Sequence, residues 1–182
     1  MKLEQTTHTT KSGKEFIIRE ASVLDSERMI DCIKSYLSSN FIPLKPEEFN
    51  PTIEEHEHWI RKFLIGKYDL LLVAVYNDQI IGNIDLTMHH RSMLSHTGHI
   101  GMGIHEDWQN QGLGTVLLDK VIEWSDSRSE IEILWLQVFG NNHKGISIYK
   151  KKGFIEEGRQ KDFIKNSKGE YIDNIIMTRK RK

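Results

Sequence analysis

HIGMGIHEDWQNQGLGT, residues 99–115, is the stretch that decides the fold of this chain. Residues 99–104 form a short apolar run typical of a strand, and a polar loop follows it. From Gly112 onward apolar residues recur at spacings of three and four, which predicts an amphipathic helix with Leu113, Val116, Leu117, Val121 and Trp124 on one face. A glycine-rich first turn leaves backbone N–H groups unpaired at the positive end of the helix dipole, so phosphate or pyrophosphate is the expected ligand.

Four interpretations of this glycine run compete. A P-loop requires Lys and then Ser or Thr, and neither follows Gly114. A dinucleotide-binding fingerprint requires a third glycine where this chain has Leu117, and a strand that ends closer to the first glycine. The pattern [Q/R]xxGx[G/A] is matched in full by Gln109, Gly112 and Gly114. A plain helix N-terminus with a tight glycine turn is the structural alternative.

A second pattern follows in LWLQVFGNNHKGISIYKKKGF, residues 134–154. Residues 133–138 are typical of a strand, and a short helix follows that Gly153 can cap. The spacing N-x-x-[A/G]-x-x-x-Y-x-x-x-G-F is carried by Asn142, Gly145, Tyr149, Gly153 and Phe154. The two patterns, in this order, resemble the signatures of the GCN5-related N-acetyltransferase (GNAT) superfamily. The resemblance covers residues 15 to 178, nearly the whole chain.

The periodicities predict one domain over residues 1–182, with residues 1–14 loosely ordered. The predicted element order is βααβββαβαββ, a mixed α/β (α+β) sheet covered by helices. The resemblance implies the acyl-CoA N-acyltransferase fold of the GNAT superfamily. Residues 70–76 form a nearly continuous apolar run, which predicts a strand buried on both faces. Thr52 to Glu55 has the form of a capping box and opens the second helix, which Gly66 ends.

Composition is that of a globular protein, with 38% hydrophobic and 28% charged residues and a net charge of −1. No global field therefore favours nucleic acid or a membrane, and neither is expected as a partner. Cys32 is the single cysteine, which excludes an internal disulfide and fits a cytoplasmic protein. The basic tail at 179–182 is interpreted as a solvated terminus. Edge strands at the C-terminal end are compatible with a homodimer.

The resemblance implies transfer of an acetyl group from acetyl-CoA to a primary amine, by direct attack and without an acyl-enzyme. The central strand would pair with the pantetheine arm as an added strand does. The glycine loop would hold the pyrophosphate, and Asn142 would contact the pantetheine arm. Lys151, one of three lysines that end the short helix, would reach the 3′-phosphate; complementing the helix dipole is the structural alternative. The cofactor-binding residues expected on this basis are Met102, Gly103, Ile104, Gln109, Asn110, Gln111, Gly112, Leu113, Gly114, Thr115, Asn142, Tyr149 and Lys151.

Tyr149 is, by resemblance, the general acid that protonates the leaving CoA sulfur; packing at a helix end is the structural alternative. A phenol of pKa about 10 is close enough to a thiol of pKa about 8.5 for that transfer. The general base is left open among Asp85, His96 and His99, because the carboxylate that many relatives carry on the central strand is replaced here by Gly98 and His99.

Five histidines between 89 and 105 raise the question of a metal site. His96 and His99 would face opposite ways if both lay on a strand, and no cysteine joins them, so no metal is expected. The stretch from Arg91 to His96 and the closing strand at 169–177 resemble a bacterial subgroup that acetylates free amino acids. On that resemblance His96 is expected to contact the acceptor.

The expected acceptor is a small amine, and an amino acid in particular. At pH 7 an amine of pKa about 10.4 is only about 0.04% neutral, whereas an α-amino group of pKa about 8 is about 10% neutral. A site without a strong base therefore favours an α-amine over a polyamine. Two alternatives remain: acetylation of a protein N-terminus, as of ribosomal proteins, and a catalytically silent acetyl-CoA sensor.

Overall fold

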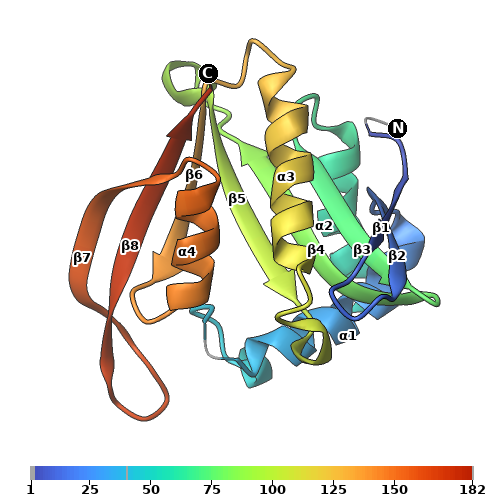
Figure 1. Cartoon of the computed structure of the whole chain (residues 1–182), viewed down its shortest axis with the longest axis horizontal. Helices are drawn as coiled ribbons and strands as arrows, with labels where there is room; N and C mark the ends of the chain where they lie inside the picture. The colour runs from blue at the N-terminus through green and yellow to red at the C-terminus, as the bar shows by residue number, and fades with distance from the viewer. Residues whose placement is uncertain (1–2, 40, 182) are drawn as a thin grey trace.

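The computed structural model describes residues 3–39 and 41–181 and contains the predicted series of strands and helices, preceded by one additional strand (Figure 1). The strands and helices are β1 (Thr6–Thr9), β2 (Glu15–Glu20), α1 (Ser26–Leu37), α2 (Ile53–Ile65), β3 (Leu70–Tyr76), β4 (Gln79–Met88), β5 (Thr97–Ile104), α3 (Leu113–Asp126), β6 (Ile133–Phe139), α4 (His143–Lys151), β7 (Ile155–Lys165) and β8 (Tyr171–Lys180).

The strands form a single mixed sheet in the order β1-β2-β3-β4-β5-β6-β8-β7. All neighbours in this order are antiparallel except β5 and β6, which are parallel. Helices α1 and α2 cover one face of the sheet, and α3 and α4 cover the other (Figure 1). The mixed α/β fold expected from the sequence is therefore confirmed. No helix in the described part of the chain is long and apolar enough to cross a membrane.

The protein has two hydrophobic cores, one on each face of the sheet, and strand β3 contributes to both. Leu70, Leu72 and Ala74 pack with α3 on one face, and the intervening Leu71, Val73 and Val75 pack with α1 and α2 on the other. All six side chains are at most 7% exposed. Because side chains alternate along a strand, only an unbroken apolar run can satisfy both faces, as predicted from residues 70–76.

Three expectations from the sequence were wrong. Residues 1–14 were expected to be loose, but β1 pairs with β2 over four residues. The spacing of apolar residues in 53–64 predicts a stripe that includes Ile53 and Leu64. These two side chains are 51% and 42% exposed, because the helix packs through His56, Ile60 and Phe63.

The basic tail is also only partly solvated. Lys180 ends β8, and Arg179 is 8% exposed. Both terminal nitrogens of Arg179 donate to the Asp126 carboxylate, at 2.9 and 2.7 Å. Asp126 is the last residue of α3, so the bidentate pair fixes β8 to the C-terminal end of that helix.

His56 gives the fold a predictable pH dependence. Its ring is 4% exposed, neither nitrogen has a hydrogen-bond partner among the described residues, and burial lowers its pKa. As pH falls below about 6.5, His56 binds a proton in the unfolded chain, whereas its imidazole in the native state remains neutral. The free energy of unfolding therefore decreases. In His56→Leu this decrease between pH 7 and 5 should be smaller than in the wild type, as measured by urea unfolding. His58→Leu on the exposed side of α2 is the control; equal slopes in wild type and His56→Leu would contradict the prediction.

Candidate active site

Strand β5 has an open hydrogen-bonding edge in the middle of the sheet. On one side β4 pairs with it along its whole length, from Gly98 to Ile104. On the other side β6 pairs only with residues 97–99, and the two strands then diverge (Figure 1). The second half of β5 therefore offers backbone groups that no neighbouring strand uses, and an extended ligand can add to such an edge.

The register shows which backbone groups these are. The His105 N–H donates to Ile81 O, and alternation places Gly103 in the next hydrogen-bonded pair with β4. Met102 and Ile104 consequently direct their N–H and C=O groups away from β4, toward the open edge. The Gln109 side-chain amide donates to Ile104 O at 3.3 Å. Of the three residues expected to bind pantetheine through the backbone, Met102 is best placed, and Gly103 is turned toward β4.

The glycine loop lies at the end of this edge. Asn110 and Gly112 both have positive φ, at 64° and 94°, and Gly112 is the N-cap of α3. Thr115 and Val116 donate to Gly112 O, so the amides of Leu113 and Gly114 precede the first intrahelical bonds and stay unpaired within the helix. A Cβ on Gly114 would lie 3.5 Å from Met102 Cε, which brings the helix start against β5. This arrangement fits a phosphate beside an added strand.

Helix α4 completes this side of the site, but its polar residues differ from the expectation. Asn142 caps the helix, and its side-chain oxygen accepts from Gly145 N at 2.9 Å. One of the two lone pairs of that oxygen therefore serves the helix cap. Lys144, which sequence reasoning missed, donates to Asn110 Oδ1 of the glycine loop at 2.8 Å. Lys151 is the last residue of α4, roughly 12 Å from the end that holds Lys144.

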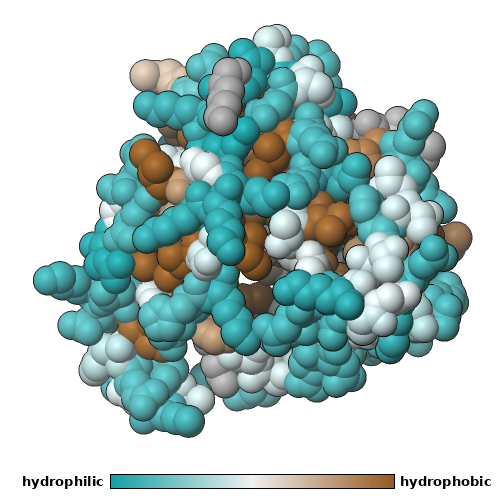
Figure 2. Space-filling view, viewed as in Figure 1, coloured by the Kyte–Doolittle hydropathy of each residue, from teal (hydrophilic) through white to brown (hydrophobic). Residues whose placement is uncertain are grey.

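Tyr149 is held between α4 and the sheet. Its side chain is 9% exposed, its ring centroid lies 5.9 Å from that of Phe154, and its hydroxyl has no hydrogen-bond partner among the described residues. Burial raises its pKa to about 12, so the phenol stays protonated at neutral pH. Figure 2 shows the surface hollowed between α3 and α4, with hydrophobic residues beside the hollow.

On the opposite face of the sheet, two glycines of β5 carry no side chain, so neighbouring groups can approach the strand backbone. A Cβ on Gly103 would lie 2.2 Å from Tyr36 Cε1, and one on Gly101 would lie 2.6 Å from Asp85 Oδ1. The Tyr36 ring and the Asp85 carboxylate can therefore lie directly against the backbone of β5. His99, on the same face, packs against Trp135 with ring centroids 4.4 Å apart. These residues lie on the face of β5 that α1 covers.

Asp85 has the electrostatics of a general base. Burial raises its pKa to about 7, and hydrogen bonds from the Thr87 hydroxyl and the Gly101 backbone oppose that shift. The Thr87 bond is 3.4 Å long. The carboxyl therefore titrates near neutrality, where it can accept and release a proton. Burial lowers the pKa of His99, which makes its imidazole a weaker proton acceptor.

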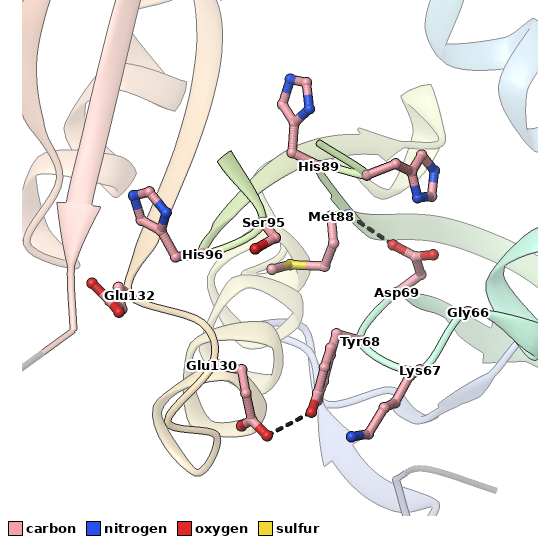
Figure 3. A pocket seen from close by; sticks show the side chains of 11 residues that line it. Gly66, Lys67, Tyr68, Asp69, Met88, His89, Ser95, His96, Glu130 and Glu132 are labelled. Carbon is pink, nitrogen blue, oxygen red and sulfur yellow. Dashed lines mark hydrogen bonds between the residues drawn. The ribbon is translucent and has the colours of Figure 1, made fainter. Parts of the chain in front are cut away.

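The structure does not bring His96 to this end of β5. It precedes the first residue of the strand, roughly 20 Å from Met102 at 3.3 Å per residue. There it lines a separate cavity of about 480 Å³ together with Asp69, His89 and Glu132 (Figure 3). Within the described residues no group of His, Cys, Asp and Glu is arranged to hold a metal.

Comparison with known proteins agrees with this geometry. L-amino acid N-acetyltransferase AaaT of Escherichia coli K12 is 32% identical over 169 residues, which cover 91% of this chain and 98% of that protein. The ribosomal protein bS18-alanine N-acetyltransferase of the same strain is 33% identical over 76 residues, only 42% of this chain and 50% of the relative.

Among solved structures, a GNAT-family acetyltransferase from Streptococcus pneumoniae is 28% identical with a TM-score of 0.86, covering 91% of this chain and 99% of that one. A Sinorhizobium meliloti phosphinothricin acetyltransferase in complex with acetyl-CoA shares the fold at 16% identity, with a TM-score of 0.79 and coverage of 96% and 89%. A sequence model of the acetyltransferase (GNAT) family matches residues 31–154. The chain belongs to this family.

Proposed function

We propose that this protein transfers the acetyl group of acetyl-CoA to the α-amine of a free amino acid, with Asp85 as base and Tyr149 as acid. The observation that carries the proposal is the Asp85 carboxylate of β4 lying against Gly101, in the half of β5 whose other edge is open. Acetyl-CoA supplies an activated acyl group as a thioester. Met102 would hold its pantetheine arm through the backbone, and the amides of the glycine loop would hold its pyrophosphate.

Each protein group then has one task. Asp85 takes a proton from the acceptor ammonium, and the free amine attacks the acetyl carbonyl carbon from the side of α1. The C–S bond breaks as the new C–N bond forms. Tyr149 donates its hydroxyl proton to the departing sulfur from the side of α4, and the second proton of the acceptor nitrogen restores the Tyr149 hydroxyl as the amide forms. Because the base and the acid lie on opposite faces of the sheet, the open edge between β5 and β6 is where donor and acceptor meet.

The pKa of Asp85 bears on the class of amine. The α-amino group of a peptide, of pKa about 8, is about one unit above a carboxyl of pKa about 7, whereas a lysine-type amine is more than three units above it. Deprotonation of a lysine-type amine therefore costs about 3 kcal/mol more at this site. The full-length similarity to an L-amino acid N-acetyltransferase supports a free amino acid over a protein N-terminus, because similarity to the ribosomal enzymes covers half of their length.

The experiment is thiol release from acetyl-CoA with L-amino acids, spermidine and an alanine-led peptide as acceptors, with acceptor-free buffer as background. Free amino acids are expected to give kcat/KM at least tenfold above the other two classes, about 1.4 kcal/mol in discrimination. Turnover with the peptide alone would replace this proposal by the ribosomal-type function. CoA binding without turnover would favour a sensor, although Asp85 supplies the carboxylate whose absence suggested that alternative.

We further propose that the enzyme works in the cytoplasm. The thiol of Cys32 is free and buried on α1, and burial raises its pKa to about 12, so it is an inert core residue rather than a nucleophile. A single reduced thiol of this kind is compatible with a reducing compartment.

A further inference from the structure

The turn between β1 and β2 touches the glycine loop, although a hundred residues separate them in the sequence. The Lys11 N–H donates to Gln111 O at 3.1 Å. A Cβ added to Gly112 would have one neighbour within 4 Å, Lys11 Cγ at 3.9 Å. The side chain of Lys11 therefore begins directly beside the residue that caps α3. This contact gives the N-terminal hairpin a place at the site that the sequence did not indicate.

The turn is held in one shape. Thr10 is 5% exposed, and its hydroxyl accepts from Lys14 N at 3.0 Å, while Gly13 donates to Thr10 O at 3.0 Å. The Lys14 ammonium lies 4.8 Å from the ring centroid of Trp108, in the segment just before the glycine loop. These contacts fix the backbone of Lys11 relative to the loop, so its side chain always starts beside Gly112.

Charge at the loop comes from both sides. Lys144 reaches Asn110 from α4, and Lys11 reaches Gly112 from the hairpin. Lys11 is exposed and has no ion pair among the described residues. A lysine on each side of the loop and the unpaired amides at the start of α3 together favour a dianionic ligand. Lys11 lies outside residues 31–154, which match the family model.

We propose that the β1–β2 turn forms part of the acyl-CoA site, next to the glycine loop, and that the Lys11 ammonium binds the pyrophosphate. This inference rests on the proposed function, because it takes CoA as the ligand of the glycine loop. It assigns a role to a strand that contributes little to either core: its residues alternate between half-buried and exposed.

The test compares binding of acetyl-CoA, 3′-dephospho-CoA and S-acetylpantetheine to the wild type, Lys11→Met and Lys11→Arg by calorimetry. Methionine keeps an apolar stem of similar length and removes the charge. Lys11→Met is expected to weaken both CoA forms about fivefold to twentyfold, as loss of a charge-assisted contact does, and to leave S-acetylpantetheine unchanged. Lys11→Arg should bind within about twofold of wild type, and the salt dependence of binding should be shallower in Lys11→Met. Lys34→Met, an exposed site on α1, is the matched control.

Three outcomes would overturn the proposal. The first is an unchanged affinity of Lys11→Met for acetyl-CoA. The second is equal weakening of S-acetylpantetheine, which would indicate a structural effect. The third is a loss that disappears with 3′-dephospho-CoA, which would place Lys11 on the 3′-phosphate. Failure of the proposed function is distinguishable, because it shows as absence of amino acid turnover in the wild type, whereas these binding measurements compare CoA affinities and need no turnover.

Discussion

Asp85→Asn is expected to lower kcat/KM for the amino acid acceptor by about 10²–10⁴-fold at pH 7, the usual contribution of a positioned general base. Asparagine keeps the size and the hydrogen bond with Thr87 but cannot take a proton from the ammonium. Affinity for acetyl-CoA should stay within about twofold, because the carboxylate lies on the face of β5 opposite α3. Steady-state kinetics and calorimetry measure the two effects.

The pH profile separates this role from a structural one. Wild-type kcat/KM should rise with pH through an apparent pKa near 7, that of Asp85, and the rise should be absent from Asp85→Asn. His99→Gln tests the neighbouring imidazole and should keep the rise, since burial lowers the pKa of His99. Asp31→Asn, on the exposed side of α1, is the control. If Asp85→Asn has wild-type kinetics, Asp85 is not the general base, and water would take that role.

Stability should change in the opposite direction to activity. Because the native pKa of Asp85 lies above its ordinary value, the folded state binds more protons than the unfolded chain between pH 4 and 7. Ionisation of Asp85 therefore costs stability as pH rises through that window. Asp85→Asn removes this cost and should have a higher Tm than wild type at pH 8. A variant that loses activity while gaining stability cannot be explained by misfolding.

The sequence predicts those features of the structure that depend on local patterns of residues, and it misses those that depend on contacts between distant segments. The caps at Thr52 and Gly153 and the apolar run of β3 were predicted correctly, because these are local patterns whose physics does not depend on partners. Strand β1 was missed for the converse reason. Its four residues are Thr, Thr, His and Thr, with no apolar alternation, and pairing with β2 decides its structure.

The residues of the candidate site likewise divide into those found from a local pattern and those brought together by packing. The glycine loop was predicted as a unit, because it is contiguous in sequence. Asp85 remained one candidate of three, because its pKa depends on burial against Gly101 of another strand. His96 was favoured because the stretch from Arg91 to His96 resembles a subgroup that acetylates amino acids, yet it lies at the other end of the central strand. Lys144 and Lys11 carry no motif, and only the packing of distant segments brings them to the loop.

Tyr149→Phe is expected to lower kcat about 10²-fold at pH 7 while leaving the affinity for acetyl-CoA and the Tm nearly unchanged. The substitution removes only the hydroxyl and keeps the ring contact with Phe154. Tyr171→Phe, at an exposed tyrosine of β8, is the matched control. If Tyr149 serves only in packing, Tyr149→Phe will have wild-type kcat.

The pH dependence of this loss identifies the acid step. A thiol of pKa about 8.5 needs a proton donor mainly below that pH, and above it the thiolate is a stable leaving group. The ratio of wild-type to Tyr149→Phe kcat should therefore shrink between pH 7 and 9.5. The phenol itself stays protonated over this range, because burial raises its pKa to about 12. A ratio constant with pH would contradict proton donation and leave Tyr149 a group that orients the thioester.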